Sequence, residues 1–243
     1  MVPSTVPLPV VTVSRVAVHS KLWYLQRFKL VDALEESQRR LLEETTRMQE
    51  VKRGQRIYQP GDSSQHFFLV KRGVIKIAAI GPSTREVLLS FRHPGDVFGE
   101  LALLDDNPRD HLAKAHEDSL ICALNRDVIL RLARESADVG FRVLTMMGRR
   151  VKQFRGRIEQ LSYKSAAVRI ARALVDLAEE HGVEDSRGTV IAFKLSQRDL
   201  ADLVGLTRET VNVVLHDLQH KGLIEQDRHV LRVLDVERLR DVK

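Results

Sequence analysis

The sequence contains a single cysteine, Cys122, among its 243 residues. One thiol excludes an internal disulfide, and it excludes an iron–sulfur cluster, which needs about four cysteine ligands. Cys122 lies in the alternating apolar stretch SLICAL, which predicts a strand with a buried thiol. A chain without disulfides suits a reducing compartment, so we expect a cytoplasmic protein.

Long apolar runs and low-complexity tracts are also missing. No stretch approaches the roughly 18 consecutive apolar residues of a membrane-spanning helix, so no membrane partner is expected. The first 20 residues are apolar, but three prolines and Arg15 interrupt them, which argues against a signal peptide. We predict a flexible N-terminal arm over residues 1–21.

Positive charge is not concentrated at the end of the chain. The net charge is +6, yet residues 164–243 contain 13 basic and 14 acidic side chains, a net charge of −1. Most of the excess falls on Arg142, Arg149, Arg150, Lys152, Arg155 and Arg157. Bulk charge alone therefore does not locate a nucleic-acid site.

Residues 50–125 show short, alternating apolar stretches separated by glycines. The segments HFFLVKRGVIKIAAI and EVLLSFRHPGDVF are typical of an antiparallel barrel or sandwich with tight turns. A helical stretch, WYLQRFKLVDALEESQRRLLEETTRM (23–48), is expected to precede them.

Residues 136–163 predict one long helix with an apolar heptad seam. The seam consists of Leu144, Met147, Val151, Phe154, Ile158 and Leu161. Its β-branched residues at one heptad position favour a parallel two-stranded pairing, hence a homodimer. The alternative is an amphipathic helix that packs on its own domain. Three arginines, Arg150, Arg155 and Arg157, flank the seam and would repel across a dimer unless carboxylates or an anion lie between them.

The segment LSQRDLADLVGLTRETVNVVLHDLQHKGLI predicts two short helices around a turn at Gly205. Ser196 is placed as an N-cap with Asp199 three residues later, a capping-box arrangement, and Thr207 can cap the second helix. Val211, Val214, Leu215 and Leu218 recur at helical spacing and are expected to face inward.

The opposite stripe of the second helix suits the major groove of DNA. It carries Arg208, Glu209, Asn212 and His216, with Val213 beside them. Arginine can donate two hydrogen bonds to guanine, and glutamate can accept one from the cytosine amino group. Asparagine pairs with adenine, and valine can contact a thymine methyl group. GLIEQDRHVLRVL then predicts a two-stranded wing. The candidate DNA contacts are Ser196, Gln197, Arg198, Thr207, Arg208, Glu209, Asn212, Val213, His216, Arg228 and His229.

These segments, in this order, resemble the CRP/FNR family of bacterial transcription regulators over about residues 22–243. GDVFGELALL is similar to the family's ligand-cassette entrance, and VGLTRETVNVVLHDLQHKGLI to its recognition helix and wing entry. The resemblance implies an α+β fold. It comprises an N-terminal antiparallel β-roll of the cyclic-nucleotide-binding type (22–135), a long dimerisation helix (136–163) and a C-terminal winged helix-turn-helix (164–243).

The resemblance also implies a DNA target. The family's base readers map to Arg208, Glu209 and Val213, the last of which is usually arginine in cAMP-type members. Part of a TGTGA-like half-site is therefore expected, with one base preference altered at Val213. A symmetric dimer would bind a palindrome with half-sites about one helical turn apart. RNA polymerase would be a further partner if the protein activates transcription.

The ligand cassette departs from the cAMP-type pattern. Glu100 and Arg109 match the residues that bind the ribose and the cyclic phosphate, but Asp110 stands where Ser or Thr would donate a hydrogen bond. An ionised carboxylate accepts only, and it repels a phosphate by about 1–4 kcal/mol at about 4 Å. Phe154 and Arg155 replace the adenine-reading Thr-Ser. The candidate effector residues are Gly99, Glu100, Leu101, Arg109, Asp110, Phe154 and Arg155.

We therefore expect that cAMP is not the effector, and three alternatives follow. The protein could act without a ligand, or bind a cyclic dinucleotide through Arg150, Arg155 and Arg157. The weakest option is haem, near His93, His111 and His116. No certain cofactor is predicted.

Other functional classes fit less well. A nucleotide-binding module without DNA activity would not need the winged helix-turn-helix. No nucleophile–base pair or metal-ligand spacing indicates an enzyme. Asp110, His111 and His116 are the residue types of a metal site. One alternating strand would point them in different directions, however, so no metal is predicted.

Overall fold

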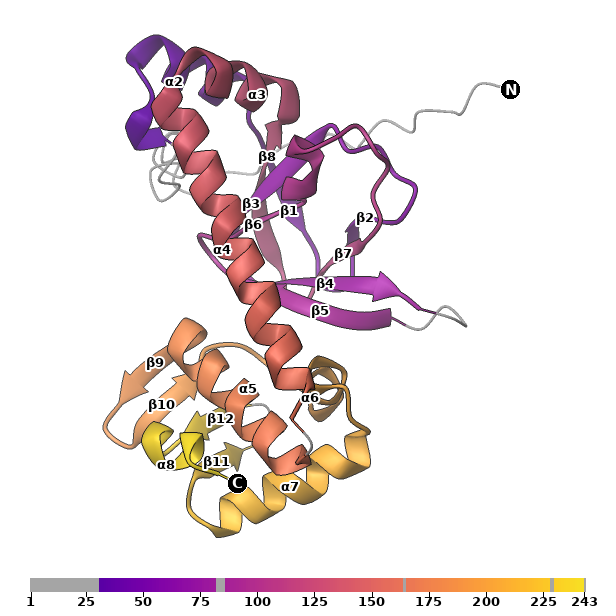
Figure 1. Cartoon of the computed structure of the whole chain (residues 1–243), viewed down its shortest axis with the longest axis vertical. Coiled ribbons are helices and arrows are strands. Elements are labelled where there is room, and N and C mark those ends of the chain that lie inside the picture. The colour runs from indigo at the N-terminus through magenta and orange to yellow at the C-terminus, as the bar shows by residue number, and fades with distance from the viewer. Residues whose placement is uncertain (1–30, 82–85, 164, 228–229, 243) are drawn as a thin grey trace. The chain divides into compact units, whose positions relative to one another are not determined.

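The computed structural model describes residues 31–81, 86–163, 165–227 and 230–242. The predicted arm over 1–21 lies outside these residues. The chain divides into two compact units (Figure 1). Of the described residues, one unit comprises those up to Ile75 with Arg92–Arg109 and Lys114–Arg142, and the other comprises those within 76–91, 110–113 and 143–242.

The predicted β-rich region forms two four-stranded sheets. The first has the order β1-β8-β3-β6 and the second the order β2-β7-β4-β5. The strands are β1 (Arg47–Val51), β2 (Arg56–Tyr58), β3 (His66–Arg72), β4 (Ile75–Ile80), β5 (Glu86–Arg92), β6 (Val97–Phe98), β7 (Leu112–Ala115) and β8 (Ser119–Asn125). In the first sheet β8 pairs antiparallel with β1 and β3. Cys122 on β8 is fully buried, as the sequence predicts.

The helix predicted over 23–48 is shorter in the structure. Its described part contains the 3-10 turn η1 (Val31–Ala33) and α2 (Glu36–Thr45). A capping box between Glu35 and Gln38 starts α2. Thr46 is extended, and its hydroxyl donates to the Leu42 carbonyl, so the chain leaves the helix before Arg47 and enters β1 instead.

Two helices follow the sheets. The first, α3 (Arg126–Glu135), has Asn125 as its N-cap, whose side chain accepts from the amides of Asp127 and Val128 at 2.9 and 3.2 Å. An extended residue, Ser136, separates it from α4 (Ala137–Leu161), a single 25-residue helix within the range predicted for one long helix.

The C-terminal part combines helices with a small sheet of order β11-β12-β10-β9. Its elements are α5 (Ala166–His181), β9 (Gly182–Asp185), β10 (Gly188–Ile191), α6 (Gln197–Val204), α7 (Arg208–His220), β11 (Ile224–Asp227), β12 (Val230–Val233) and α8 (Val236–Arg240). The strand expected from TVIAFKL ends at Ile191, because His181, the residue opposite Ala192 in the register, already belongs to α5. The sequence reasoning did not identify β9.

Candidate functional site

The turn between α6 and α7 is built by three local interactions that the sequence predicts. Ser196 caps α6, since its hydroxyl accepts from the Asp199 amide at 3.1 Å. Gly205 adopts φ +65°, a left-handed conformation that glycine accepts at low cost. Thr207 caps α7 by accepting from the Thr210 amide at 3.2 Å. These interactions set the direction in which α7 leaves the turn.

Packing then determines which side of α7 faces outward. Val211, Leu215 and Leu218 are buried and Val214 is half-buried, so this side joins the core. The opposite stripe is exposed and carries Arg208, Glu209, Asn212, Val213 and His216. Val213 is 68% exposed although it is apolar.

The start of α6 lies beside this stripe. The Gln197 side-chain amide donates to the Asn212 side-chain oxygen at 3.0 Å, which ties the first turn of α6 to the outward face of α7. Ser196 and Arg198 are exposed, and Gln197 is half-buried. The predicted DNA contacts at the two helix starts therefore share one region of the surface with the outward stripe of α7.

The wing is an antiparallel hairpin of β11 and β12 whose register pairs Asp227 with Val230. Its predicted phosphate contacts, Arg228 and His229, lie outside the described residues. Sequence reasoning missed the residue that braces this hairpin, Arg232, which donates to Asp185 at 2.8 Å and also contacts Glu225. Hydrogen bonds from the Arg187 amide and the Arg232 guanidinium lower the pKa of Asp185.

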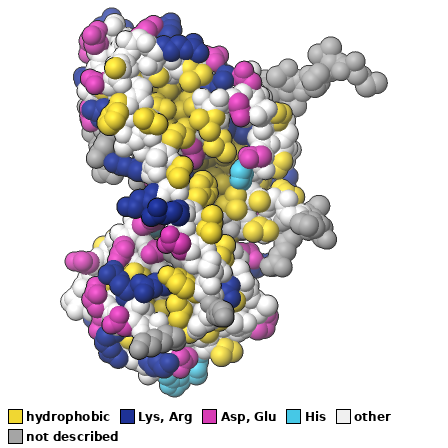
Figure 2. Space-filling model, viewed as in Figure 1, with side chains coloured by type: hydrophobic (Ala, Val, Ile, Leu, Met, Phe, Trp, Pro, Cys, Tyr) yellow, Lys and Arg dark blue, Asp and Glu magenta, His cyan; other side chains and the backbone are white. Residues whose placement is uncertain are grey.

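The predicted seam on α4 is largely exposed. Leu144, Val151 and Ile158 are each about two-thirds exposed, Phe154 and Leu161 are about half exposed, and Met147 is half-buried. Figure 2 shows hydrophobic side chains along the region where α4 crosses the view. Isolated apolar residues at a surface are ordinary, whereas here five exposed apolar side chains recur at heptad spacing along one helix.

Two arginines beside the seam have partners on the same helix. Arg155 lies 3.6 Å from Glu159, and Arg150 donates to the Gln153 side chain at 2.8 Å. Arg150 is buried, whereas Arg155 is exposed. The side chain of Arg157 lies outside the described residues. Part of the positive charge that flanks the seam is thus balanced locally.

The cassette holds its arginine against protein atoms. Arg109 is only 7% exposed, and its guanidinium donates to the Gly99 carbonyl at 2.9 Å and to the His66 carbonyl. It also stacks on the Tyr58 ring, 4.4 Å from the ring centre. Tyr58 in turn stacks with Phe68 at 5.9 Å. The group predicted to clamp a phosphate therefore contacts two backbone carbonyls and an aromatic ring of its own chain.

The entrance of the cassette depends on Gly99. This residue has φ +70°, and a Cβ there would lie 2.9 Å from an Arg109 nitrogen, so a larger residue would displace the guanidinium. Gly99 precedes the 3-10 turn η3 (Glu100–Leu103), in which Glu100 is buried and Leu101 exposed.

Asp110 and His111 correct one expectation. The sequence predicted that one alternating strand would point Asp110 and His111 in different directions. In the structure the Asp110 carboxylate contacts Nδ1 of His111. Both residues precede β7, so strand alternation does not apply to them. Among the described residues, no group of three or more His, Cys, Asp or Glu could hold a metal ion.

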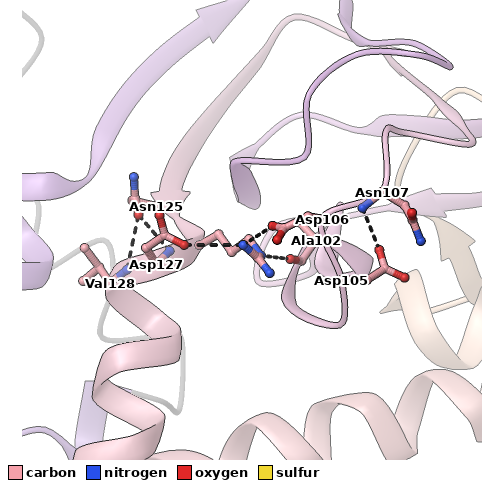
Figure 3. A network of polar contacts seen from close by, with 8 residues as sticks. Ala102, Asp105, Asp106, Asn107, Asn125, Asp127 and Val128 are labelled. Atoms are coloured by element: carbon pink, nitrogen blue, oxygen red, sulfur yellow. Dashed lines mark hydrogen bonds and ion pairs between the residues drawn. The ribbon is translucent and has the colours of Figure 1, made fainter.

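A residue that sequence reasoning missed fixes the loop between Glu100 and Arg109. Arg126, at the start of α3, donates to the Ala102 carbonyl and contacts the carboxylate of Asp106 (Figure 3). Asp105 accepts from the Asn107 amide at 3.1 Å in the same loop. The remaining effector candidates, Phe154 and Arg155, are exposed on α4 in the second unit.

Comparisons with known proteins match both halves of the chain. A family model described as "Cyclic nucleotide-binding domain" matches residues 48–136, and one described as "Crp-like helix-turn-helix domain" matches residues 168–242. A cyclic AMP receptor protein of Thermus thermophilus is 30% identical over 189 residues, which cover 78% of this chain and 84% of that protein.

Other relatives agree. A CRP-like cAMP-activated global transcriptional regulator of Mycobacterium tuberculosis is 28% identical over 187 residues, 77% of this chain and 84% of its own length. The solved structure of FixK2 from Bradyrhizobium japonicum has a TM-score of 0.72 at 22% identity, and it covers 81% of this chain and 96% of its own. Within the described ranges, no helix is long and apolar enough to cross a membrane.

The predicted α+β fold and the resemblance are confirmed. The relatives are regulators rather than enzymes, in agreement with the sequence prediction. With a cyclic-nucleotide-binding domain followed by a Crp-like helix-turn-helix domain, the chain belongs to the CRP/FNR family of DNA-binding transcription regulators.

Proposed function

We propose that the protein acts as a homodimer that binds a palindromic DNA site through α7 and does not require cAMP. The observation that carries the proposal is the exposed stripe of Arg208, Glu209, Asn212 and Val213 on a helix whose opposite side is buried. These four side chains offer a donor pair, an acceptor, an amide and an apolar contact, which together can distinguish base pairs in the major groove.

Homodimerisation is supported by the seam on α4. Six apolar residues repeat at alternating spacings of three and four along a helix of 25 residues, and five of them are exposed. Pairing with a second copy would remove this surface from water. Two copies of α7 related by a two-fold axis would then read a palindrome, with TGTGA-like half-sites about one helical turn apart.

Independence from cAMP is supported by the cassette. Removing Arg109 from the Gly99 and His66 carbonyls would break two charge-assisted hydrogen bonds, each worth about 1.5–3 kcal/mol. Asp110 adds a negative charge at the position where cAMP-type members supply a hydroxyl donor. The opposing observation is that two relatives carry cAMP in their names, so cAMP is the competing effector that an experiment must address.

A cyclic dinucleotide is the second candidate effector, because it would bring phosphates to the basic residues of α4. The contacts of Arg150 with Gln153 and of Arg155 with Glu159 provide partners without a ligand. A regulator without a bound ligand therefore already provides contacts for Arg150 and Arg155, and a cyclic dinucleotide is not needed to explain them. RNA polymerase is the further partner if the protein activates transcription. The bacterial cytoplasm is the proposed location, because the DNA target lies there.

Selection from a random duplex library by the full-length protein tests the DNA-binding part of the proposal. We expect enrichment of a palindrome with two half-sites, and light scattering after size exclusion should give twice the chain mass of 27.7 kDa. Recovery of no sequence preference, or of a single half-site by a monomer, would overturn this part.

A further inference from the structure

Two histidines one helical turn apart stand on the exposed side of α7. The ring centres of His216 and His220 lie 4.4 Å apart with an angle of 62° between the ring planes, and both residues are exposed. Residues four positions apart lie on the same side of a helix. Histidine side chains are visible at the lower end of the view in Figure 2.

This separation matches that of two imidazoles that share one metal ion. Bonds of about 2.0–2.1 Å from zinc to each ring nitrogen place the two ring centres roughly 4.5–5 Å apart. The helix backbone holds the pair in this arrangement, because α7 packs into the core through Val211, Leu215 and Leu218. Rotation of exposed side chains is enough to turn one nitrogen of each ring toward a common point.

We propose that His216 and His220 bind one divalent transition-metal ion, of the group Zn²⁺, Ni²⁺ and Cu²⁺, through one nitrogen each. Imidazole is a preferred ligand for these ions. The neighbouring Asp217 is engaged with Lys221 at 2.7 Å, so it is not counted as a ligand. Since no group of three ligands occurs among the described residues, water completes the coordination and the ion exchanges readily.

Binding of the ion would compete with DNA. This step rests on the proposed function, because His216 belongs to the stripe assigned to the major groove. A hydrated ion on His216 occupies the space between α7 and the base edges, and by linkage DNA would weaken binding of the ion by the same factor. The consequence is a regulator whose DNA affinity falls when the transition metal is available.

The test uses the full chain without a histidine tag and titrates Zn²⁺ by calorimetry in a buffer that does not bind metals. We expect one ion per chain in the wild type. The His220→Ala variant should bind at least about 10- to 100-fold more weakly, which is the loss that removal of even an outer-shell partner causes. Gln219→Ala, an exposed neighbour on another side of the helix, serves as the control and should bind as the wild type does. Circular dichroism establishes that both variants are folded.

Equal Zn²⁺ affinity in wild type and His220→Ala would overturn the site. Fluorescence anisotropy of the selected duplex then tests the competition. Zn²⁺ should weaken DNA binding by the wild type and by Gln219→Ala, but not by His220→Ala. If Zn²⁺ binds as expected and DNA affinity is unchanged, the competition is wrong. If no DNA binds even without metal, the proposed function fails while the calorimetry still decides the metal site.

Discussion

Arg208 on α7 and Arg109 in the cassette are both arginines at positions that the CRP/FNR family uses to bind a ligand. Arg208 is exposed at the first residue of a helix whose other side is buried. Arg109 is buried, donates to two carbonyls of its own chain and stacks on Tyr58. The comparison shows that an arginine at a position matching the family's pattern does not by itself present its charge to a ligand.

The difference arises from what surrounds each side chain. An exposed guanidinium keeps its hydration until DNA replaces it, so binding exchanges water for base edges and phosphates. A buried guanidinium must retain hydrogen bonds inside the protein, since an unsatisfied buried charge costs several kcal/mol. The carbonyls of Gly99 and His66 supply two of those bonds in the cassette, and both would be lost if a phosphate drew the guanidinium away from them.

The largest expected effect concerns the dimer, because Arg208 can read both halves of the proposed palindrome only if two copies of α7 are held together. Val151→Glu places a carboxylate in the seam of each copy. We expect dimer affinity to fall roughly 100-fold or more, equivalent to about 3 kcal/mol, because the two charges would be desolvated and repel. Analytical ultracentrifugation measures the change, with Val151→Leu as the control that keeps the seam apolar. A Val151→Glu protein that remains a dimer would assign the seam another role.

The next effect separates a DNA reader from an ordinary surface arginine. Arg208→Ala should lower affinity for the selected duplex about 5- to 150-fold, the equivalent of the roughly 1–3 kcal/mol of one bidentate base contact. Arg131→Ala removes the same charge from the surface of α3 and should leave that affinity nearly unchanged. Anisotropy at fixed salt compares them. Equal losses in the two variants would mean that α7 does not read bases.

An effect on stability rather than on binding sharpens the account of the cassette. Arg109→Ala should lower the free energy of unfolding by about 3 kcal/mol or more, since it removes two hydrogen bonds from a charged group and a cation–π contact. Asp110→Ala, the neighbouring exposed residue, should stay within about 0.5 kcal/mol of the wild type. Urea denaturation gives both values. If Arg109→Ala is as stable as Asp110→Ala, the guanidinium is not needed for the fold and is available to a ligand.

The smallest effect is the pH dependence at His66. Burial, followed by the charges of Arg47 and Arg109, lowers the pKa of His66 below its ordinary value of 6.5. The unfolded chain therefore takes up this proton first on acidification. The contribution of His66 to stability is present above pH 6.5 and is lost as the pH falls toward the lowered pKa of the folded state.

Urea denaturation at about pH 7.5 and about pH 5.5 detects this loss when wild type is compared with His66→Gln. The wild type should lose more stability between the two pH values than the variant does. An equal loss in both proteins would show that His66 does not titrate as the burial and the two arginines require.

Features set by neighbouring residues were predictable from the sequence. The caps at Ser196 and Thr207, the left-handed turn at Gly205 and the buried side of α7 follow from rules that involve a few residues each. The family and the fold followed from the order of these segments.

Features that depend on contacts distant in sequence were not predictable. The Arg109 guanidinium meets the carbonyl of His66, 43 residues away, and Arg126 meets that of Ala102. Periodicity carries no information about such pairs. The contact between Asp110 and His111 was missed for another reason, because it depends on where β7 begins, and strand boundaries are the least certain part of a sequence prediction.

The central claim is that this chain binds DNA without cAMP, and one titration tests it most directly. Anisotropy of a labelled palindromic TGTGA-type duplex is followed against the purified wild-type protein at fixed salt, because phosphate contacts make affinity depend on salt. We expect tight binding that cAMP does not change. Binding that appears only when cAMP is added would contradict it, and would mean that the pocket accepts the nucleotide despite Asp110 and the buried Arg109.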